Sequence, residues 1–447
     1  MYRIPLRRTV CLALTCGLIA TSLAACTGDS SNGKIVLTVN GLPPKTEKAN
    51  HKKFLDDVAE FEKLNPDIDI QPHEGKMDPK TFTSRLAGGQ LEDVFYVYFT
   101  DPANLIAKHQ AADISEYVDD FDSVKLIRKD LMRIFTGPGG AVYGLPAKNY
   151  SLGLLYNRAL FTKAGLDPDR PPTTWDDVRS AAAKIAKLGG KTAGYGDYST
   201  NNTGGWHFTA ELYSMGGKIA VKHGKTYKAA FNDSLGRKVL QNLSDMRWKD
   251  HSMGARQQLD YDDLLRMMGS GKLGMYVATG DNIPIIVQQY DGHYKDYGLG
   301  PIPDGAGTLA GGEGYMFNPK DTPDKIRAGL KWLTFAFDNP DRIDHNIKWE
   351  SKVGNPVGLP QPAIWTGDAD KSWSAALKTY ANVPRGNYKP FVDGMAQVPI
   401  RVEPPKAQQV YAVLDEAMNS VLTDEHADIG KLLDTAEADV NTILAEA

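Results

Sequence analysis

The chain has 447 residues, of which 42% are hydrophobic and 24% charged, with a formal net charge of -4. This length exceeds what a single core usually holds, so two lobes are expected in an ordinary soluble globular protein. The mildly acidic balance and the lack of a clustered basic surface exclude a typical nucleic-acid-binding protein.

The first 25 residues predict an export signal. Arg3, Arg7 and Arg8 precede an apolar run at 10–19, and small residues close it before Cys26. An ordinary cleavable signal, or a cytosolic protein with an apolar start, is the alternative. Leu23-Ala24-Ala25-Cys26 resembles the lipobox of bacterial lipoproteins, in which the cysteine becomes the lipidated first residue, and residues 26–33 would then be a flexible tether.

Cysteine usage agrees with this interpretation. Cys11 and Cys16 would leave with the signal and Cys26 would be acylated, so no thiol remains for a disulfide, a nucleophile or a thiolate metal site.

The N-terminal half predicts alternating strands and helices. Residues 34–42 alternate as a strand, 51–64 form an amphipathic helix and 68–71 a second strand, which together indicate a βαβ unit with parallel strands. A helix at 81–87, a strand at 93–97 and a helix at 105–112 follow. Gly144 and Pro146 are expected to break the preceding element.

Beyond this break, a buried strand is expected at 151–156 and a short helix at 159–164. Thr173 or Thr174 can cap the next helix, which has Asp176 and Asp177 in its first turn and continues through 179–188. A helix at 262–268 and a strand at 274–276 come next. Thr322-Pro323 opens another helix, and helices at about 406–422 and 429–444 close the chain.

Residues 143–178 (YGLPAKNYSLGLLYNRALFTKAGLDPDRPPTTWDDV) carry a long motif. This motif resembles the extracellular solute-binding proteins of bacterial ABC importers, specifically the sugar-binding family that includes maltodextrin-binding proteins. FEKLNPDI at 61–68, DVFYV at 93–97 and GMY at 274–276 match further family segments, although no proline precedes Asp93. Residues 297–303 and 311–317 match the second crossing between lobes.

The resemblance implies an α/β, two-lobed periplasmic-binding-protein fold, in which each lobe is a mostly parallel sheet flanked by helices, joined by a multi-strand hinge. Residues 34–147 and 314–397 would form lobe 1, and 148–313 and 398–447 lobe 2. The hinge would run near 147–150, 311–315 and 398–403.

The sequence contains no complete motif of the common enzyme classes. Gly190-Lys191-Thr192 lacks the first glycine of a phosphate loop, since Ile185 stands there. The histidines are scattered, no Gly-x-Ser-x-Gly elbow occurs, and adjacent carboxylates such as Asp262-Asp263 point apart on a helix. We expect no catalytic residue, metal or cofactor, although a glycosidase pair could still be formed at long range.

Aromatic residues stand in loops rich in Gly, Asn and Pro, as a carbohydrate site requires, because sugars offer apolar faces and a ring of hydroxyls. Trp206 is the first candidate for a ligand contact, in a segment 201–207 expected to be a loop.

The resemblance places Tyr150 and Glu313 at the crossings where relatives contact their ligands, and Asp281 stands where many relatives carry a tryptophan. Trp365 either lines the cleft or plugs lobe 1; Arg385 and Arg401 are surface candidates. The predicted ligand-binding residues are Trp206, Tyr150, Glu313, Asp281, Asn40, Tyr98, Asn149, Tyr315, Asn355 and Trp365.

The expected function is that of a monomeric, lipid-anchored receptor on the outer face of the bacterial cell membrane. It would capture a sugar or oligosaccharide in an interlobe cleft and deliver it to ABC permease transmembrane subunits. Two rivals remain: the same fold binding a polyamine, phosphate ester or metal complex, and a secreted glycan-active enzyme.

Overall fold

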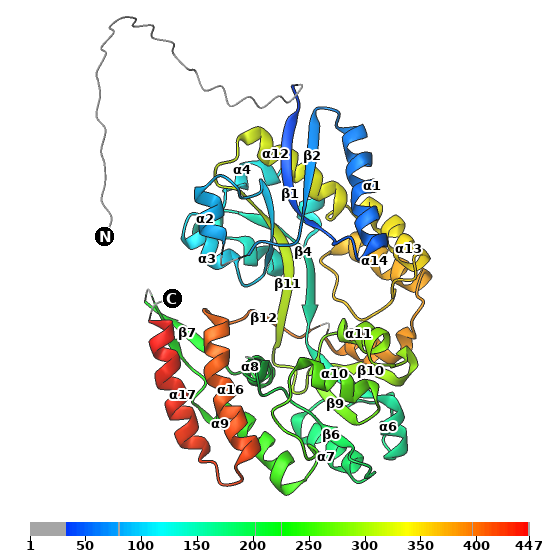
Figure 1. Cartoon of the computed structure of the whole chain (residues 1–447), viewed down its shortest axis with the longest axis vertical. Coiled ribbons are helices and arrows are strands. Elements are labelled where there is room, and N and C mark those ends of the chain that lie inside the picture. Colours follow the sequence, from blue (N-terminus) through cyan, green and yellow to red (C-terminus); the bar gives the residue numbers. More distant parts are fainter. Residues whose placement is uncertain (1–32, 79–80, 202, 225, 396, 446–447) are drawn as a thin grey trace, which may run out of the picture.

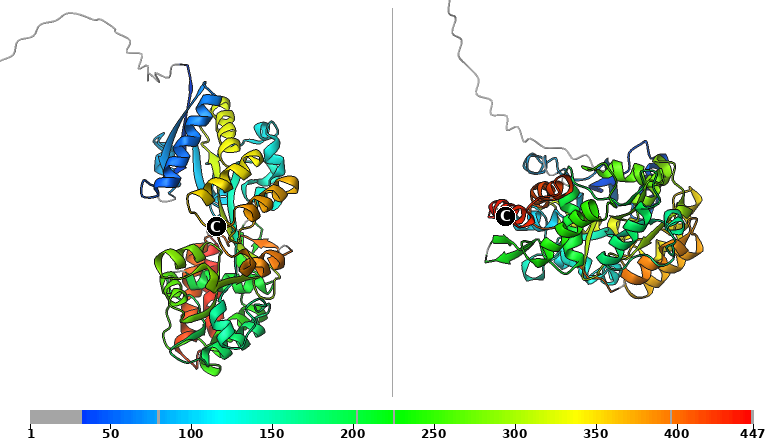
Figure 2. Two further views of the ribbon diagram at one scale, coloured as in Figure 1. Left: turned by 90° about the vertical axis from the view of Figure 1, so that its right-hand side faces the viewer. Right: turned by 90° about the horizontal axis from the view of Figure 1, so that it is seen from below.

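The computed structural model describes residues 33–445, except 79–80, 202, 225 and 396. The expected signal peptide, Cys26 and the tether up to residue 32 lie outside the described residues. The chain forms two lobes, one above the other in Figure 1, connected by the long strands β4 and β11. Figure 2 shows the same two lobes from the side.

The first lobe is built on a sheet of order β12-β11-β3-β1-β2, with β4 paired to the other edge of β11. β1 is parallel to β2 and β3, whereas β11 runs antiparallel to β3 and β4. Its elements are β1 (Ile35–Leu42), α1 (Lys48–Leu64), β2 (Ile68–Glu74), α2 (Phe82–Ala87), β3 (Val94–Tyr98), α3 (Pro102–Ala107), α4 (Ser115–Val118), α5 (Lys129–Met132), β4 (Gly144–Ser151), β11 (Thr308–Phe317), α12 (Pro323–Ala336), α13 (Ile343–Lys352), α14 (Gly367–Thr379) and β12 (Ile400–Arg401).

The second lobe is built on a sheet of order β10-β5-β9-β6, with a separate hairpin of β7 and β8. Its elements are β5 (Gly153–Asn157), α6 (Arg158–Lys163), α7 (Trp175–Ala186), β6 (Ala193–Tyr195), α8 (Thr203–Ser214), β7 (Ala220–His223), β8 (Thr226–Ala229), α9 (Ser234–Ser244), α10 (Tyr261–Gly269), β9 (Leu273–Ala278), α11 (Asn282–Gln289), β10 (Tyr297–Gly300), α15 (Lys389–Met395), α16 (Ala407–Thr423) and α17 (Ile429–Leu444).

The expectation of mostly parallel sheets is wrong for the second lobe. β5 runs antiparallel to both β10 and β9, and only the β6–β9 pairing is parallel. The antiparallel pairing arises where the chain passes between the lobes. β5 directly follows β4 in the chain and β10 directly precedes β11, so neither strand belongs to a local βαβ unit.

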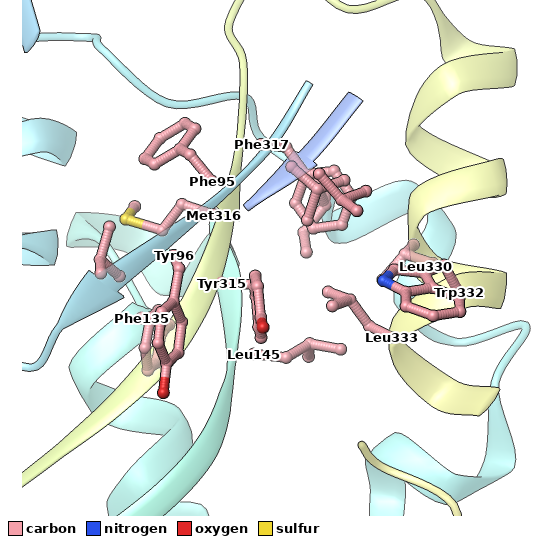
Figure 3. Packing of buried hydrophobic residues seen from close by; sticks show 14 of the residues in the cluster. Phe95, Tyr96, Phe135, Leu145, Tyr315, Met316, Phe317, Leu330, Trp332 and Leu333 are labelled. Carbon is pink, nitrogen blue, oxygen red and sulfur yellow. The ribbon is translucent and has the colours of Figure 1, made fainter. Parts of the chain in front are cut away.

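The first core forms where helices cover both faces of the sheet. On one side Trp332 of α12 lies 5.4 Å from Phe61 and 5.5 Å from Phe54 of α1, measured between ring centroids. On the other side Phe82 of α2 lies 5.4 Å from Phe95 of β3. Figure 3 shows α12 facing the strands of this core. The apolar faces of α1 and α12 were predicted from their periodicity, and they pack as expected.

The preceding element ends before Gly144, as predicted, but β4 begins at Gly144 and passes through Pro146, a strand that the sequence analysis did not predict. Pro146 lies opposite Gly314, and the pairing then skips Ala147 before Glu313 meets Lys148. Such a bulge tolerates proline, which has no N–H to donate to the ladder.

The boundary expected at residue 397 also differs. Val383, Tyr388 and Phe391 pack in a core cluster of the second lobe with Leu299 of β10, so the chain leaves the first lobe earlier than expected. The last first-lobe core residue before this transition is Ala376 of α14. The apolar side chains at 383–391 pack against the second lobe, and no local sequence signal predicts this.

Candidate functional site

One face of the first sheet presents tyrosines beside a carboxylate. Tyr98 of β3 lies opposite Glu313 of β11, and Tyr96 lies opposite Tyr315. On the other edge of β11, Lys148 of β4 faces Glu313. Because side chains alternate along strands, all five share one face of the sheet.

Lys76, which follows β2, completes this arrangement. Its ammonium pairs with Glu313 and lies 4.3 Å from the centroid of the Tyr98 ring and 5.0 Å from that of Tyr96. The Tyr96 hydroxyl also donates to Glu313. Burial of Glu313 opposes its ionisation, but the bonds from Lys76 and Tyr96 and the charges of Lys76 and Lys148 outweigh it and lower the Glu313 pKa. Tyr98 remains 47% exposed.

Tyr150 connects this face to the second lobe. Its ring lies across Gly311, the residue opposite on β11, where a Cβ atom would come 2.1 Å from the tyrosine hydroxyl oxygen. Burial raises the pKa of Tyr150, and the negative charges of Glu403, Asp281 and Glu313 raise it further. Three carboxylates from separate parts of the chain therefore act on one half-buried tyrosine.

Glu403 lies between β12 and α16 and is half-buried. Burial and the charge of Asp101 raise its pKa to about 7, although the nearby Tyr411 hydroxyl and Trp206 indole favour the ionised form. Asp101 accepts a hydrogen bond from the backbone N–H of Tyr98 at 2.9 Å. Despite this bond, burial raises the pKa of Asp101 to about 6. Asp101 of the first lobe and Trp206 of the second lobe therefore both act on the Glu403 carboxyl group.

The loop expected at 201–207 is wrong, because residues from 203 onward form α8 and Trp206 lies in its first turn. Gly205 allows α8 to pack closely against α16, because a Cβ atom at this position would lie 2.3 Å from the backbone oxygen of Tyr411. The N–H of Gly205 donates to Oδ1 of Asp415 at 2.7 Å. Trp206 is half-buried, with its ring 6.4 Å from that of Tyr198.

Three predicted ligand contacts are held inside the first lobe. Trp365 is 4% exposed and forms a β-bridge with Ile127, so it plugs the core, the second of the two roles expected for it. Tyr315 is also buried in that core. Asn355 uses its amide nitrogen to donate to Oδ1 of Asn50 at 3.2 Å. Apolar burial and local hydrogen bonding account for these three residues.

Asn40 and Asn149 are buried, and Oδ1 of Asn40 and both amide atoms of Asn149 make no hydrogen bond within the described residues. Asp281 is exposed before α11 and accepts a hydrogen bond from Thr279. Arg385 lies close to Gly358, whereas Arg401 is exposed on β12. Of the predicted residues, Tyr98 and Glu313 lie opposite each other on paired strands, and both act on Tyr150, as does Asp281. Trp206 acts on Glu403, which in turn acts on Tyr150.

Sequence reasoning missed Lys76, Tyr96, Asp101, Glu403 and Tyr411 as site residues. Asp101 lies three residues after the predicted contact Tyr98, and Glu403 ends the expected hinge segment 398–403, so the positions of both residues offered a signal. Lys76 and Tyr411 had none, because their place depends on tertiary packing.

The second lobe buries a separate group of ionisable side chains behind Trp206. His207 pairs with Asp197, and the hydroxyl of Tyr195 donates to Oε1 of Glu211 at 3.1 Å. Burial raises the pKa of Asp197 to about 8 and lowers that of His207 to about 3. The side chains of Asp197 and His207 are inaccessible, so they do not meet a solute in this conformation.

Within residues 33–445, gaps excepted, no group of three or more His, Cys, Asp or Glu side chains could hold a metal ion. None of the helices in the described part of the chain is long and apolar enough to cross a membrane.

Comparisons with known proteins identify the family. Residues 46–342 match the model of the bacterial extracellular solute-binding protein family. A binding protein from Brucella abortus (strain 2308) is 24% identical over 399 residues, covering 86% of this chain and 90% of the relative. The arabinooligosaccharide-binding protein of Bacillus subtilis is 27% identical over 255 residues, 54% of each chain.

Among solved structures, the cyclic alpha-maltosyl-1,6-maltose binding protein from Arthrobacter globiformis superposes with a TM-score of 0.71 at 22% identity. That match covers 93% of this chain and 100% of the other. Since the family match spans well over half of the sequence, this chain belongs to the bacterial extracellular solute-binding proteins.

Proposed function

We propose that this protein is the substrate-binding subunit of an ABC importer, which captures a sugar or oligosaccharide between its lobes and delivers it to a permease. A lipidated Cys26 anchors it to the outer face of the cell membrane. The proposal includes no catalytic step, in keeping with its family of binding proteins.

One observation carries the proposal: Tyr150 lies on β4, opposite Gly311 of β11, on the strands that connect the lobes, and carboxylates from three segments raise its pKa. Exposed Tyr98 and half-buried Trp206 add aromatic surface on either side. Flat rings suit the apolar faces of a sugar, and carboxylates accept hydrogen bonds from its hydroxyls. Relatives named for oligosaccharides support the same ligand class.

Closure would be a hinge motion through β4, β11 and the segment before α16. A ligand favours the closed state only through contacts that are better there than in the open state. Tyr98 with Asp101 on one lobe, and Trp206 with Asp281 on the other, are placed to provide such contacts.

A thermal-shift screen tests the proposal. The purified protein is heated with mono- and oligosaccharides, polyamines and phosphorylated compounds. Ligand at a hundred times its Kd stabilises by about 2.7 kcal/mol, a shift of a few degrees. We expect a sugar to respond and to remain unhydrolysed when the mixture is analysed by chromatography. A response confined to phosphorylated compounds would refute the sugar, and hydrolysis would favour a glycan-active enzyme.

A further inference from the structure

Three side chains form a row across the sheet of the first lobe. Tyr98 of β3 and Lys148 of β4 lie directly opposite Glu313, on either side of β11. Residues paired in this way point to the same face, and their Cβ atoms lie about 4.5–5.5 Å apart. Lys76 reaches over this row, with its ammonium 4.3 Å from the centroid of the Tyr98 ring. We call these four residues the Tyr98 face.

Both carboxylate oxygens of Glu313 are already bonded. Oε1 accepts from the Lys76 ammonium, and Oε2 accepts from the Tyr96 hydroxyl. The same ammonium lies 5.0 Å from the centroid of the Tyr96 ring, so this tyrosine holds both partners of the ion pair in place. Because Lys76 compensates the charge of Glu313, Lys148 is not needed as its counter-ion.

Both lysines keep hydrogen-bond donors for another partner. Lys148 is exposed, and its ammonium forms no ion pair or hydrogen bond within the described residues. The Lys76 ammonium has three N–H groups, of which Glu313 accepts one in the described part of the chain. Two ammonium groups therefore face one carboxylate, which leaves one positive charge in this row without a partner.

The acid that follows Tyr98 does not supply the missing counter-charge. Asp101 accepts a hydrogen bond from the backbone N–H of Tyr98 at 2.9 Å, and it forms no ion pair with Lys76 or Lys148. Both lysines instead act on Glu313 and lower its pKa, as their opposite pairing with this residue on the sheet leads one to expect.

The Tyr98 face is open to a solute. Tyr98 is 47% exposed, and the side chain of Lys76 is 31% exposed. Lys148 lies two residues before Tyr150 on the strand that connects the lobes. A sugar ring against Tyr98 would therefore have its substituents beside two ammonium groups that can donate hydrogen bonds.

We propose that the Tyr98 face binds a carboxylate of the transported solute, so that the ligand is a uronic acid or an oligosaccharide containing one. This inference rests on the proposed function and narrows its ligand. The carboxylate would accept hydrogen bonds from Lys148 and Lys76, while the sugar ring lies against Tyr98. One unpartnered positive charge suits a carboxylate with its single negative charge better than a phosphate monoester, which carries about −1.5 to −2 at pH 7.

Matched pairs of acidic and neutral compounds test the inference. Binding of glucuronic acid and glucose, and of digalacturonic acid and its methyl ester, is measured by calorimetry with the purified protein at pH 8. Glucose 6-phosphate and glycerol 3-phosphate serve as anions of the other class. We expect each acid to bind at least tenfold more tightly than its neutral partner. Added NaCl should weaken the binding of the acid more than that of the neutral compound, because salt screens charge interactions.

Variants locate the effect. Lys148→Gln removes the unpartnered charge, so it should reduce the affinity for the acid at least tenfold and bring it close to that of the neutral partner. Lys76 is left unchanged, because its removal would leave Glu313 without a counter-ion. Lys222→Gln, which changes an exposed lysine on β7, is the matched control and should change neither affinity. Melting temperatures check the folding of both variants, and the wild-type comparison does not depend on any variant.

The outcomes separate the two proposals. If neutral sugars bind as tightly as their acidic partners, the carboxylate inference is refuted and sugar capture stands. If an acid binds preferentially but equally well to Lys148→Gln, the carboxylate lies elsewhere and the inference is refuted. A preference for the phosphate esters over the uronic acids would also overturn it. If no acid binds, the inference is wrong, and the neutral sugars alone decide the proposed function.

Discussion

The ring of Tyr150 occupies the space that a side chain at Gly311 would take. The hydroxyl oxygen lies 2.1 Å, and the carbon that bears it 2.2 Å, from an ideal Cβ at Gly311. The two residues are directly paired on β4 and β11. A glycine at this position therefore allows an aromatic ring to lie flat on the strand that joins the lobes.

We expect Gly311→Ala to displace this ring. Overpacking of this kind typically costs about 1–3 kcal/mol, and affinity for the ligand identified by the screen should fall at least tenfold because Tyr150 leaves its place. Gly386→Ala is the control, since a Cβ there meets nothing within 4 Å. Calorimetry that finds unchanged affinity in Gly311→Ala would remove Tyr150 from the site.

Trp206→Ala should reduce both affinity and stability. The ring is half-buried against Tyr198 and His207, with centroids 6.4 Å and 5.4 Å away, so its loss removes packing as well as a ligand surface. We expect at least a tenfold loss of affinity and a lower melting temperature of the ligand-free protein.

Trp248→Ala provides the comparison for Trp206→Ala. Trp248 is also half-buried in the second lobe, and its indole N–H donates to the carbonyl of Val421 at 2.8 Å. This variant should lose stability and keep its affinity. Equal affinities in the two variants would show that Trp206 has only a structural role.

The stability of the ligand-free protein should depend on pH through Glu403. Burial raises the pKa of this carboxyl from its ordinary value of 4.5 to about 7 in the folded chain. The folded state therefore binds the proton more tightly, and the wild type loses stability as the pH rises from about 4.5 to about 7. Above that window the loss is complete and constant.

Glu403→Gln removes this titration. Its melting temperature should exceed that of the wild type at pH 8 and approach it at pH 4. Glu416→Gln, which changes a carboxylate exposed on α16, is the control and should follow the wild type throughout. A Glu403→Gln protein that melts below the wild type at pH 8 would contradict the unfavourable burial of the charge.

Cys26→Ser should release the protein from the membrane. Without the thiol no acyl chain can be attached, and no described helix could span the bilayer in its place. We expect the variant in the soluble extracytoplasmic fraction, without incorporation of labelled fatty acid and with an unchanged melting temperature. Retention of the variant in washed membranes would mean that another contact holds the protein there.

Helices with clear amphipathic periodicity could be predicted from the sequence. Phe54, Val58 and Phe61 recur at helical spacing and are the buried residues of α1. Thr174 and Thr322 cap α7 and α12 through their side-chain oxygens, as their sequence context predicted. Caps and amphipathic faces depend on a few neighbouring residues, so local sequence contains the information.

The candidate site was only partly predictable. Tyr150 and Glu313 were identified through a long motif and a matching crossing segment. Trp206 was identified for a mistaken reason, since the glycines beside it indicate close contact between α8 and α16, not a loop. A glycine in sequence does not reveal whether it serves a turn or the approach of another backbone.

The sequence by itself determined the amphipathic helices with their caps, the family resemblance and the aromatic character of the candidate site. Only the tertiary structure decided that Lys76 lies over Tyr98, that Asp101 approaches Glu403, and that Trp365 is buried in the first lobe. The physical reason is the separation of the interacting residues along the sequence. Caps and helical faces arise between residues a few positions apart. Ion pairs, aromatic contacts and burial arise between segments that are brought together only when both cores form.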